Sequence, residues 1–199
     1  MEVLEAVRSR ASVRFFREDP IPEDLIREIL EAGIRAPNAG GAEQWFFVVV
    51  KSEEKRREIH RLLLRAHLEY FRSRREPLPE EKLEKLASRI ERGMYRAPLY
   101  IAAYVDLRRK IMRDEYGDIE WMMALESVSA AIENMILAAW SRGIGSVWLG
   151  VPVLLEEEFD RILKPPRGTK LAAIVAFGYL GAPVKPRRRR PLEEVSIEV

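Results

Sequence analysis

The sequence predicts an α+β fold. Helical and extended patterns are intermixed along the chain, but the extended runs are too few for a doubly wound parallel sheet. The segment Asp118–Arg142 is long and apolar around much more than one stripe, which places it in the centre of the fold or at a subunit interface. With 199 residues, 47% of them hydrophobic, the chain can bury a core, and we expect one domain over residues 1–199.

The helices are predicted from their apolar spacing and from their start and stop residues. Pro22 starts the second helix, and Pro37 ends it because a proline disfavours α geometry in the residue before it. Gly143 caps the long helix. The expected helices are Glu2–Ser9, Glu23–Arg35, Glu53–Ser73, Glu80–Arg92, Asp118–Arg142 and Leu155–Leu163.

The strands are predicted from unbroken runs of aliphatic, β-branched and aromatic residues, a pattern typical of buried strands. The clearest run, Trp45–Val50, follows a loop over Asn38–Glu43. The tail Pro183–Val199 is interrupted by prolines and arginines. The expected strands are Trp45–Val50, Leu99–Val105, Ser146–Leu149 and Lys170–Tyr179.

Composition excludes several classes of function. The 34 basic and 32 acidic residues leave a net charge of +2, too small for a dedicated nucleic-acid binder. The absence of cysteine excludes disulfides, thiolate metal sites and a cysteine nucleophile. We expect a cytoplasmic protein without a membrane span, because no run of about 18 apolar residues occurs and the N-terminus is acidic. Abundant Arg and Glu, with almost no Asn or Gln, suggest a thermophilic source.

The familiar catalytic motifs are missing, and no metal site is expected. His60 and His67 lie seven residues apart on one helix, about 10 Å along its axis, so both cannot hold one ion. We interpret them as solvated helix histidines. Gly143-x-Gly145 with Gly150 has the wrong spacing for a dinucleotide-binding turn and lies between a helix and a strand, whereas that turn lies between a strand and a helix.

Three segments are candidates for ligand binding. Arg10, Ser12 and Arg14 alternate, so in an extended segment they project to one side, where two guanidinium groups and a hydroxyl suit a phosphate. In the loop Pro37–Glu43, glycines allow the backbone to approach a flat polar ligand. The third is the arginine run Arg187–Arg190. The alternatives are, in turn, a solvated basic stretch, an ordinary helix-to-strand connection and a solvated tail.

Taken in order, these features resemble the FMN-dependent nitroreductase family. The resemblance covers about Val3 to Val195. It rests on Arg10-x-Ser12-x-Arg14, the run from Ala36 to Val50, the segments Ala131–Ala139 and Gly143–Gly150, and Gly178-Tyr179 with Arg189-x-Pro191-Leu192.

The resemblance implies a nitroreductase-like α+β fold with a central mixed or antiparallel sheet flanked by helices. It also implies a homodimer that holds FMN at the interface of its two chains, with the long helix forming that interface. By position, Arg10, Ser12 and Arg14 would meet the phosphate region, and Arg187 and Arg189 of the tail would close on it. The loop residues that would line the flavin from the partner chain are Pro37, Asn38, Ala39 and Gly41, and the residues that would touch the ring through their backbone are Leu149 and Gly150.

The implied activity is transfer of a hydride from NAD(P)H to a nitroaromatic, quinone or similar small acceptor by a ping-pong mechanism, with no catalytic side chain required. Glu43, with Ser127-Val128-Ser129, also resembles the iodotyrosine deiodinase branch, whose substrate lid would lie between His60 and Arg92. A non-catalytic flavin-storage protein is a further alternative. We expect the Glu43 carboxylate to lower the FMN potential by like-charge repulsion, unless it simply points into solvent.

Overall fold

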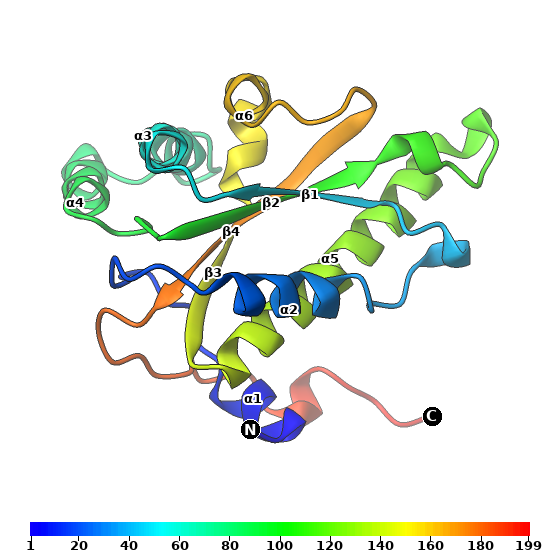
Figure 1. Cartoon of the computed structure of the whole chain (residues 1–199), viewed down its shortest axis with the longest axis horizontal. Helices are drawn as coiled ribbons and strands as arrows, with labels where there is room; N and C mark the ends of the chain where they lie inside the picture. Colours follow the sequence, from blue (N-terminus) through cyan, green and yellow to red (C-terminus); the bar gives the residue numbers. More distant parts are fainter.

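The sheet lies between two layers of helices in the computed structural model, which describes residues 1–199 (Figure 1). Its strands are all antiparallel and follow the order β1-β2-β4-β3. The bounds are β1 Trp45–Val50, β2 Leu99–Asp106, β3 Ile144–Leu149 and β4 Thr169–Tyr179. The predicted α+β fold is confirmed, and its sheet is antiparallel throughout.

One face of the sheet is covered by helices α3, α4 and α6, and the other face by α2 and α5 (Figure 1). The helix bounds agree with the sequence prediction to within two residues. They are α1 Val3–Ser9, α2 Glu23–Gly33, α3 Glu53–Arg72, α4 Glu80–Glu91, α5 Gly117–Ser141 and α6 Glu156–Leu163, with short 3₁₀ turns η1 Ala39–Gly41, η2 Leu107–Arg109, η3 Asp114–Tyr116, η4 Val151–Leu155 and η5 Leu192–Glu194.

Strand β2 is buried along its whole length because it supplies both cores. Tyr100 and Tyr104 point into the core under α3, α4 and α6, whereas Ile101 and Val105 point into the core under α2 and α5. This alternation explains why the strand reads as a continuous apolar run. In contrast, Trp45–Val50 is a strand as predicted, but the prediction that it is buried is wrong except for Val50, because β1 lies at a sheet edge and its other residues are half-buried.

Helix α5 crosses the sheet beside α2 and carries a buried stripe from Ala124 to Ala139 (Figure 1). Its N-terminal half also exposes apolar side chains, including Ile119 and Met122. By length and hydropathy alone the stretch Asp114–Ser141 could cross a membrane. That is weak evidence, because the central helix of a protein core passes the same test and α5 packs in this core.

The interpretation of His60 and His67 as solvated residues is wrong, because both are buried. His60 Nε2 lies 3.1 Å from the carbonyl oxygen of Met94, and His67 Nδ1 lies 2.7 Å from that of Leu63. The ring of His67 stacks on Tyr95, with 4.6 Å between ring centroids. Burial disfavours the charged imidazolium and lowers the pKa of both histidines.

We predict that the protein loses stability as the pH falls below 6.5, the ordinary histidine pKa. The folded state keeps the lowered pKa values, so unfolding takes up protons in this window and stability rises with pH. Each histidine adds at most about 1.4 kcal/mol per pH unit. Thermal unfolding of His60→Gln/His67→Phe should depend less on pH than that of the wild type between about pH 7.5 and 5. Equal pH dependence of the two proteins would contradict the prediction.

Candidate functional site

The predicted phosphate-binding residues lie on an extended segment, Arg10–Arg14, that runs parallel to the start of β3; we call this segment the strap. Val13 N–H donates to the carbonyl oxygen of Ser146 at 2.8 Å. Gly145 permits this approach, since a Cβ at that position would lie 2.5 Å from Val13 Cγ2. Ala11 and Val13 are buried, whereas the alternating residues Arg10, Ser12 and Arg14 are half-buried. These three therefore share the outer side of the strap, as the alternation predicts.

The strap retains hydrogen-bond donors for a ligand. Arg10 Nε lies 3.4 Å from Glu133 Oε1 on α5, and Arg14 Nη1 donates to the carbonyl oxygen of Ser12 at 3.2 Å. The Ser12 hydroxyl makes no hydrogen bond within the chain. Because a guanidinium group carries five N–H donors, the remaining set of two cations and a hydroxyl fits a phosphate group.

The loop Asn38–Glu43, which we call the glycine loop, contains three residues in left-handed backbone conformations. Gly40, Gly41 and Glu43 all have positive φ, at 57°, 68° and 50°. Ala39 N–H donates to Ser127 Oγ on α5 at 3.1 Å, and Glu43 N–H donates to Asn38 Oδ1 at 2.9 Å. Ala42 N–H bonds back to Ala39. Within Ala39–Glu43, at most the amides of Gly40 and Gly41 can therefore face a ligand. Glycine adopts a positive φ freely, so the strained residue of the loop is Glu43, and such strain is concentrated at functional sites.

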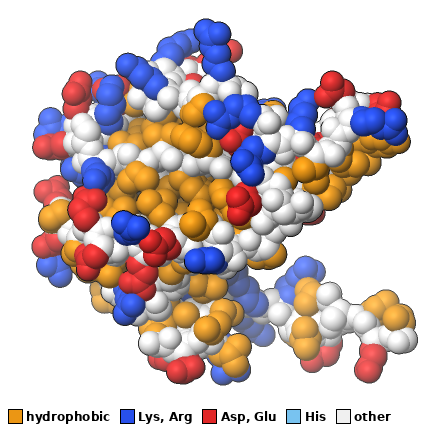
Figure 2. Space-filling view, turned by 45° about the vertical axis from the view of Figure 1, so that its right-hand side comes forward, with side chains coloured by type: hydrophobic (Ala, Val, Ile, Leu, Met, Phe, Trp, Pro, Cys, Tyr) orange, Lys and Arg blue, Asp and Glu red, His pale blue; other side chains and the backbone are white.

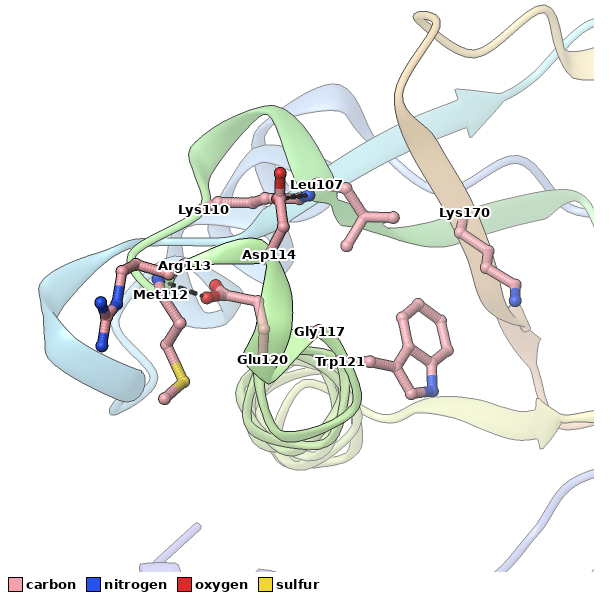
Figure 3. Close-up of a pocket in the computed structure, with 9 residues that line it drawn as sticks. All are labelled: Leu107, Lys110, Met112, Arg113, Asp114, Gly117, Glu120, Trp121 and Lys170. Carbon is pink, nitrogen blue, oxygen red and sulfur yellow. Dashed lines mark hydrogen bonds and ion pairs between the residues drawn. The ribbon is translucent and has the colours of Figure 1, made fainter.

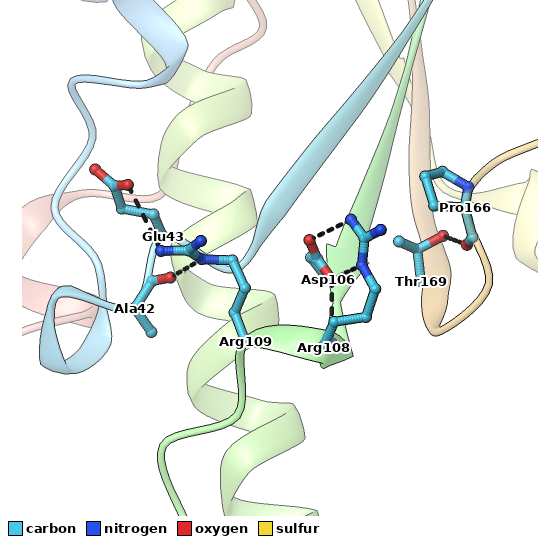
Figure 4. Close-up of polar contacts among 7 residues, drawn as sticks. All are labelled: Ala42, Glu43, Asp106, Arg108, Arg109, Pro166 and Thr169. Atoms are coloured by element: carbon cyan, nitrogen blue, oxygen red, sulfur yellow. Dashed lines mark hydrogen bonds and ion pairs between the residues drawn. The ribbon is translucent and has the colours of Figure 1, made fainter.

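Arg109, which the sequence analysis did not single out, joins this loop from the end of β2 (Figure 4). Its Nε donates to the carbonyl oxygen of Ala42 at 2.6 Å. Its Nη2 lies 4.0 Å from Glu43 Oε2. The Glu43 side chain is 59% exposed, so this carboxylate is both solvated and close to a cation.

A second contact that the sequence analysis missed joins Gln44 to Glu120 at the start of α5. Gln44 Nε2 donates to Glu120 Oε1 at 2.5 Å, and both residues are buried. Glu120 also accepts hydrogen bonds from the backbone amide of Met112 (Figure 3) and from that of Ile111. The sequence did indicate that Glu120 is buried, because it lies four residues before Ala124 and so falls on the buried stripe of α5.

The strap and the glycine loop both contact α5 but at different places. Arg10 pairs with Glu133 and Ala39 bonds to Ser127, positions six residues and about 9 Å apart along the helix. No hydrogen bond or ion pair joins the strap to the loop directly.

The remaining predicted residues lie at the end of β3 and in the tail. Leu149 is buried in the core and Gly150 is exposed beside it. Arg187 and Arg189 are exposed and make no polar contact within the chain. Figure 2 shows the C-terminal segment as an arm that projects from the body of the molecule. Within one chain, the tail arginines therefore do not pair with the strap.

A cavity of about 240 Å³ is lined in part by Glu120 (Figure 3). Leu107, Met112 and Trp121 form its apolar walls, and Lys170 Nζ lies 4.7 Å from the centroid of the Trp121 ring. None of the predicted ligand-binding residues lines this cavity.

The segment predicted to hold a substrate lid, between His60 and Arg92, forms most of α3 and all of α4 on the sheet face opposite α5 (Figure 1). Tyr70 and Phe71 pack edge to face near the end of α3. Tyr95 is buried beneath His67.

The fold is that of a class of proteins with FMN-bound members. It matches a nitroreductase with bound FMN from Desulfitobacterium hafniense DCB-2 with a TM-score of 0.75, over 100% of this chain and 99% of the other, at 23% identity. A family model described as "Nitroreductase family" matches residues 7–179. The chain belongs to the nitroreductase family, which confirms the resemblance found in the sequence.

Two relatives cover nearly the whole chain. The NADH dehydrogenase of Thermus thermophilus is 27% identical over 96% of this chain and 92% of its own length. The iodotyrosine deiodinase of Thermotoga neapolitana is 26% identical over 96% of this chain and 93% of its own length.

Proposed function

We propose that this protein is an FMN-dependent oxidoreductase that takes a hydride from NADH or NADPH and reduces a nitroaromatic, quinone or similar small acceptor. The observation that carries the proposal is the strap. In a chain of the nitroreductase family, it presents two guanidinium groups and an uncommitted hydroxyl on one side, which is a donor set for a phosphate. The structural neighbour from D. hafniense, which holds FMN, supports the identity of the cofactor.

In this proposal the strap binds the FMN phosphate. The phosphate carries close to two negative charges, and Arg10 and Arg14 offset the cost of removing it partly from water. Ser12 donates its hydroxyl. Arg187 and Arg189 reach the same phosphate when the tail folds onto the site.

A homodimer would complete the site. Apolar side chains are exposed on α1, on the N-terminal half of α5 and on the tail, more than an isolated chain is expected to show. They include Val3, Leu4, Val7, Ile119, Met122, Leu192 and Ile197. The strap and the glycine loop do not meet within one chain. In the dimer, Pro37, Asn38, Ala39 and Gly41 would line the flavin bound to the partner's strap, and Leu149 and Gly150 would face the ring through their backbone.

The redox chemistry, hydride transfer from the nicotinamide to the acceptor, would be supplied by FMN when it is bound. The chain then has three tasks: to bind the phosphate, to orient the ring through the glycine loop, and to leave one ring face open for donor and acceptor in turn. No acid–base or nucleophilic side chain is needed for these tasks, in keeping with the missing catalytic motifs.

Reductive deiodination is the second candidate function. The similarity to the deiodinase of T. neapolitana and the presence of Glu43 at the end of the glycine loop favour it. A comparison of turnover with iodotyrosine and with a nitroaromatic, both at the same concentration of reduced protein, separates the two functions.

We predict that purified protein is yellow, is bleached by NADH or NADPH and regains its colour on addition of an acceptor.

Arg10→Ala/Arg189→Ala should weaken FMN binding by about a hundredfold, because two charge-assisted hydrogen bonds are lost. Fluorescence titration of the apoprotein with FMN measures the dissociation constant.

The matched control is Arg27→Ala/Arg161→Ala, which removes the same charge from two arginines that pair within their own helices. It should bind FMN as the wild type does. Stoichiometric FMN in Arg10→Ala/Arg189→Ala would refute the phosphate assignment. FMN that is bound but reduced by neither nicotinamide would favour the storage protein.

We predict that Glu43→Gln raises the midpoint potential of bound FMN by about 30 mV, since loss of a nearby negative charge stabilises the anionic reduced ring. The shift is modest because Arg109 already offsets part of the charge. Spectroelectrochemical titration measures the potential, with Glu31→Gln, a carboxylate paired on α2, as the control. An unchanged potential would show that the Glu43 carboxylate simply points into solvent.

A further inference from the structure

The glycine loop lies against a second segment, Leu107–Arg113, which we call the brace. Arg109 of the brace donates to the carbonyl oxygen of Ala42 at 2.6 Å (Figure 4). Ile111 packs so closely on Gly40 that a Cβ there would lie 2.7 Å from Ile111 Cδ1. The conformation of the loop therefore depends on where the brace lies.

The start of the brace is fixed to the end of β2. Asp106 Oδ1 and Oδ2 each accept a hydrogen bond from the Arg108 guanidinium at 2.7 Å (Figure 4). Leu107 N–H donates to the carbonyl oxygen of Gly168 at 2.9 Å. The brace thus leaves the sheet in a defined direction.

The other part of the brace is fixed by Glu120. Its carboxylate accepts from Met112 N–H at 2.7 Å (Figure 3) and from Ile111 N–H at 3.2 Å. The same carboxylate accepts from Gln44 Nε2 at 2.5 Å, and Gln44 directly follows the glycine loop. One side chain therefore connects the brace, the loop and α5.

Both side chains of this connection are buried, so breaking their hydrogen bond costs more free energy than breaking one at the surface. Glu120 is 3% exposed and Gln44 is 1% exposed. Burial alone would raise the pKa of Glu120, but hydrogen bonds from Met112, Gln44 and Ile111, together with the charge of Lys110, hold that pKa below its usual range. A buried carboxylate that loses its donors is strongly destabilising.

We propose that Glu120 is a positioning residue for the flavin site: by joining Gln44 to the brace, it holds the glycine loop in the conformation that receives the FMN ring. The proposal rests on the proposed function, because it assigns the loop to flavin. Because Glu120 is buried and its hydrogen bonds go to Gln44, Ile111 and Met112, it acts through Gln44 and the brace.

The test reverses the direction of the Gln44–Glu120 hydrogen bond. Gln44→Glu places two carboxylates face to face in a buried site, so it should force the loop and the brace apart. In the double variant Gln44→Glu/Glu120→Gln, the amide of residue 120 donates to the carboxylate of residue 44, and its carbonyl still accepts from the brace. The double variant should therefore restore the arrangement.

Two measurements read the outcome. Hydrogen exchange of the full-length apoprotein at the Ala39 and Ile111 amides reports the order of the loop and brace without any flavin. Titration with FMN reports binding. Gln44→Glu should speed exchange and weaken FMN binding by about tenfold or more each, and the double variant should return both to within about threefold of the wild type. Exchange at the Leu171 amide, which donates to Glu156 Oε1 at 2.7 Å, should stay unchanged as an internal control.

If Gln44→Glu does not fold, a second pair of variants makes the same comparison: Glu120→Gln can keep the link between Gln44 and the brace, and Glu120→Ala removes it. The glutamine can re-form the bonds once Gln44 turns its amide over and should bind FMN almost normally, whereas the alanine should bind at least about tenfold more weakly. A lower melting temperature with unchanged FMN affinity would overturn the proposal, as would a double variant that binds no better than Gln44→Glu. If the wild type binds no FMN, the proposed function fails, while the exchange data still decide whether Glu120 orders the loop.

Discussion

The burial of helix α5 against the sheet is the constraint on which the rest of the structure depends. Its stripe from Ala124 to Ala139 fills the core beside α2, and this burial is the main source of stability near that face. The same helix carries three polar anchors, Glu120, Ser127 and Glu133, which hold the brace, the glycine loop and the strap. A shift of α5 would therefore move the strap and the glycine loop together.

This arrangement gives the chain a simple chemical role. In the proposed function the strap supplies donors to a phosphate and the glycine loop receives a flat ring, and no group of catalytic side chains is needed beside them. Proteins that use flavins commonly divide the work in this way, with the cofactor carrying the electrons and the protein setting binding, orientation and electrostatics. The near-neutral net charge gives no indication of a phosphate site, because it averages over the whole chain. The arginines assigned to the phosphate lie near the two ends of the sequence.

Features governed by local sequence could be predicted, and features governed by distant contacts could not. The helices, their proline and glycine boundaries and the alternation of the strap follow from spacing along the chain. The edge position of β1 depends on the strand order, which the spacing does not encode. His60 and His67 lie on a highly charged helix, but the segment around Tyr95 covers them. Arg109 reaches Ala42 and Glu120 reaches Gln44 only after the sheet has brought the two regions together.

The most direct test of the central claim is a crystal structure of the full chain grown with FMN. We expect the phosphate within hydrogen-bond distance of Arg10, Ser12 and Arg14 of one chain, with the ring against Pro37–Ala39 of a second chain. A phosphate bound away from the strap, or a ring enclosed by a single chain, would contradict the claim that the two ends of the chain and a partner's glycine loop form the site.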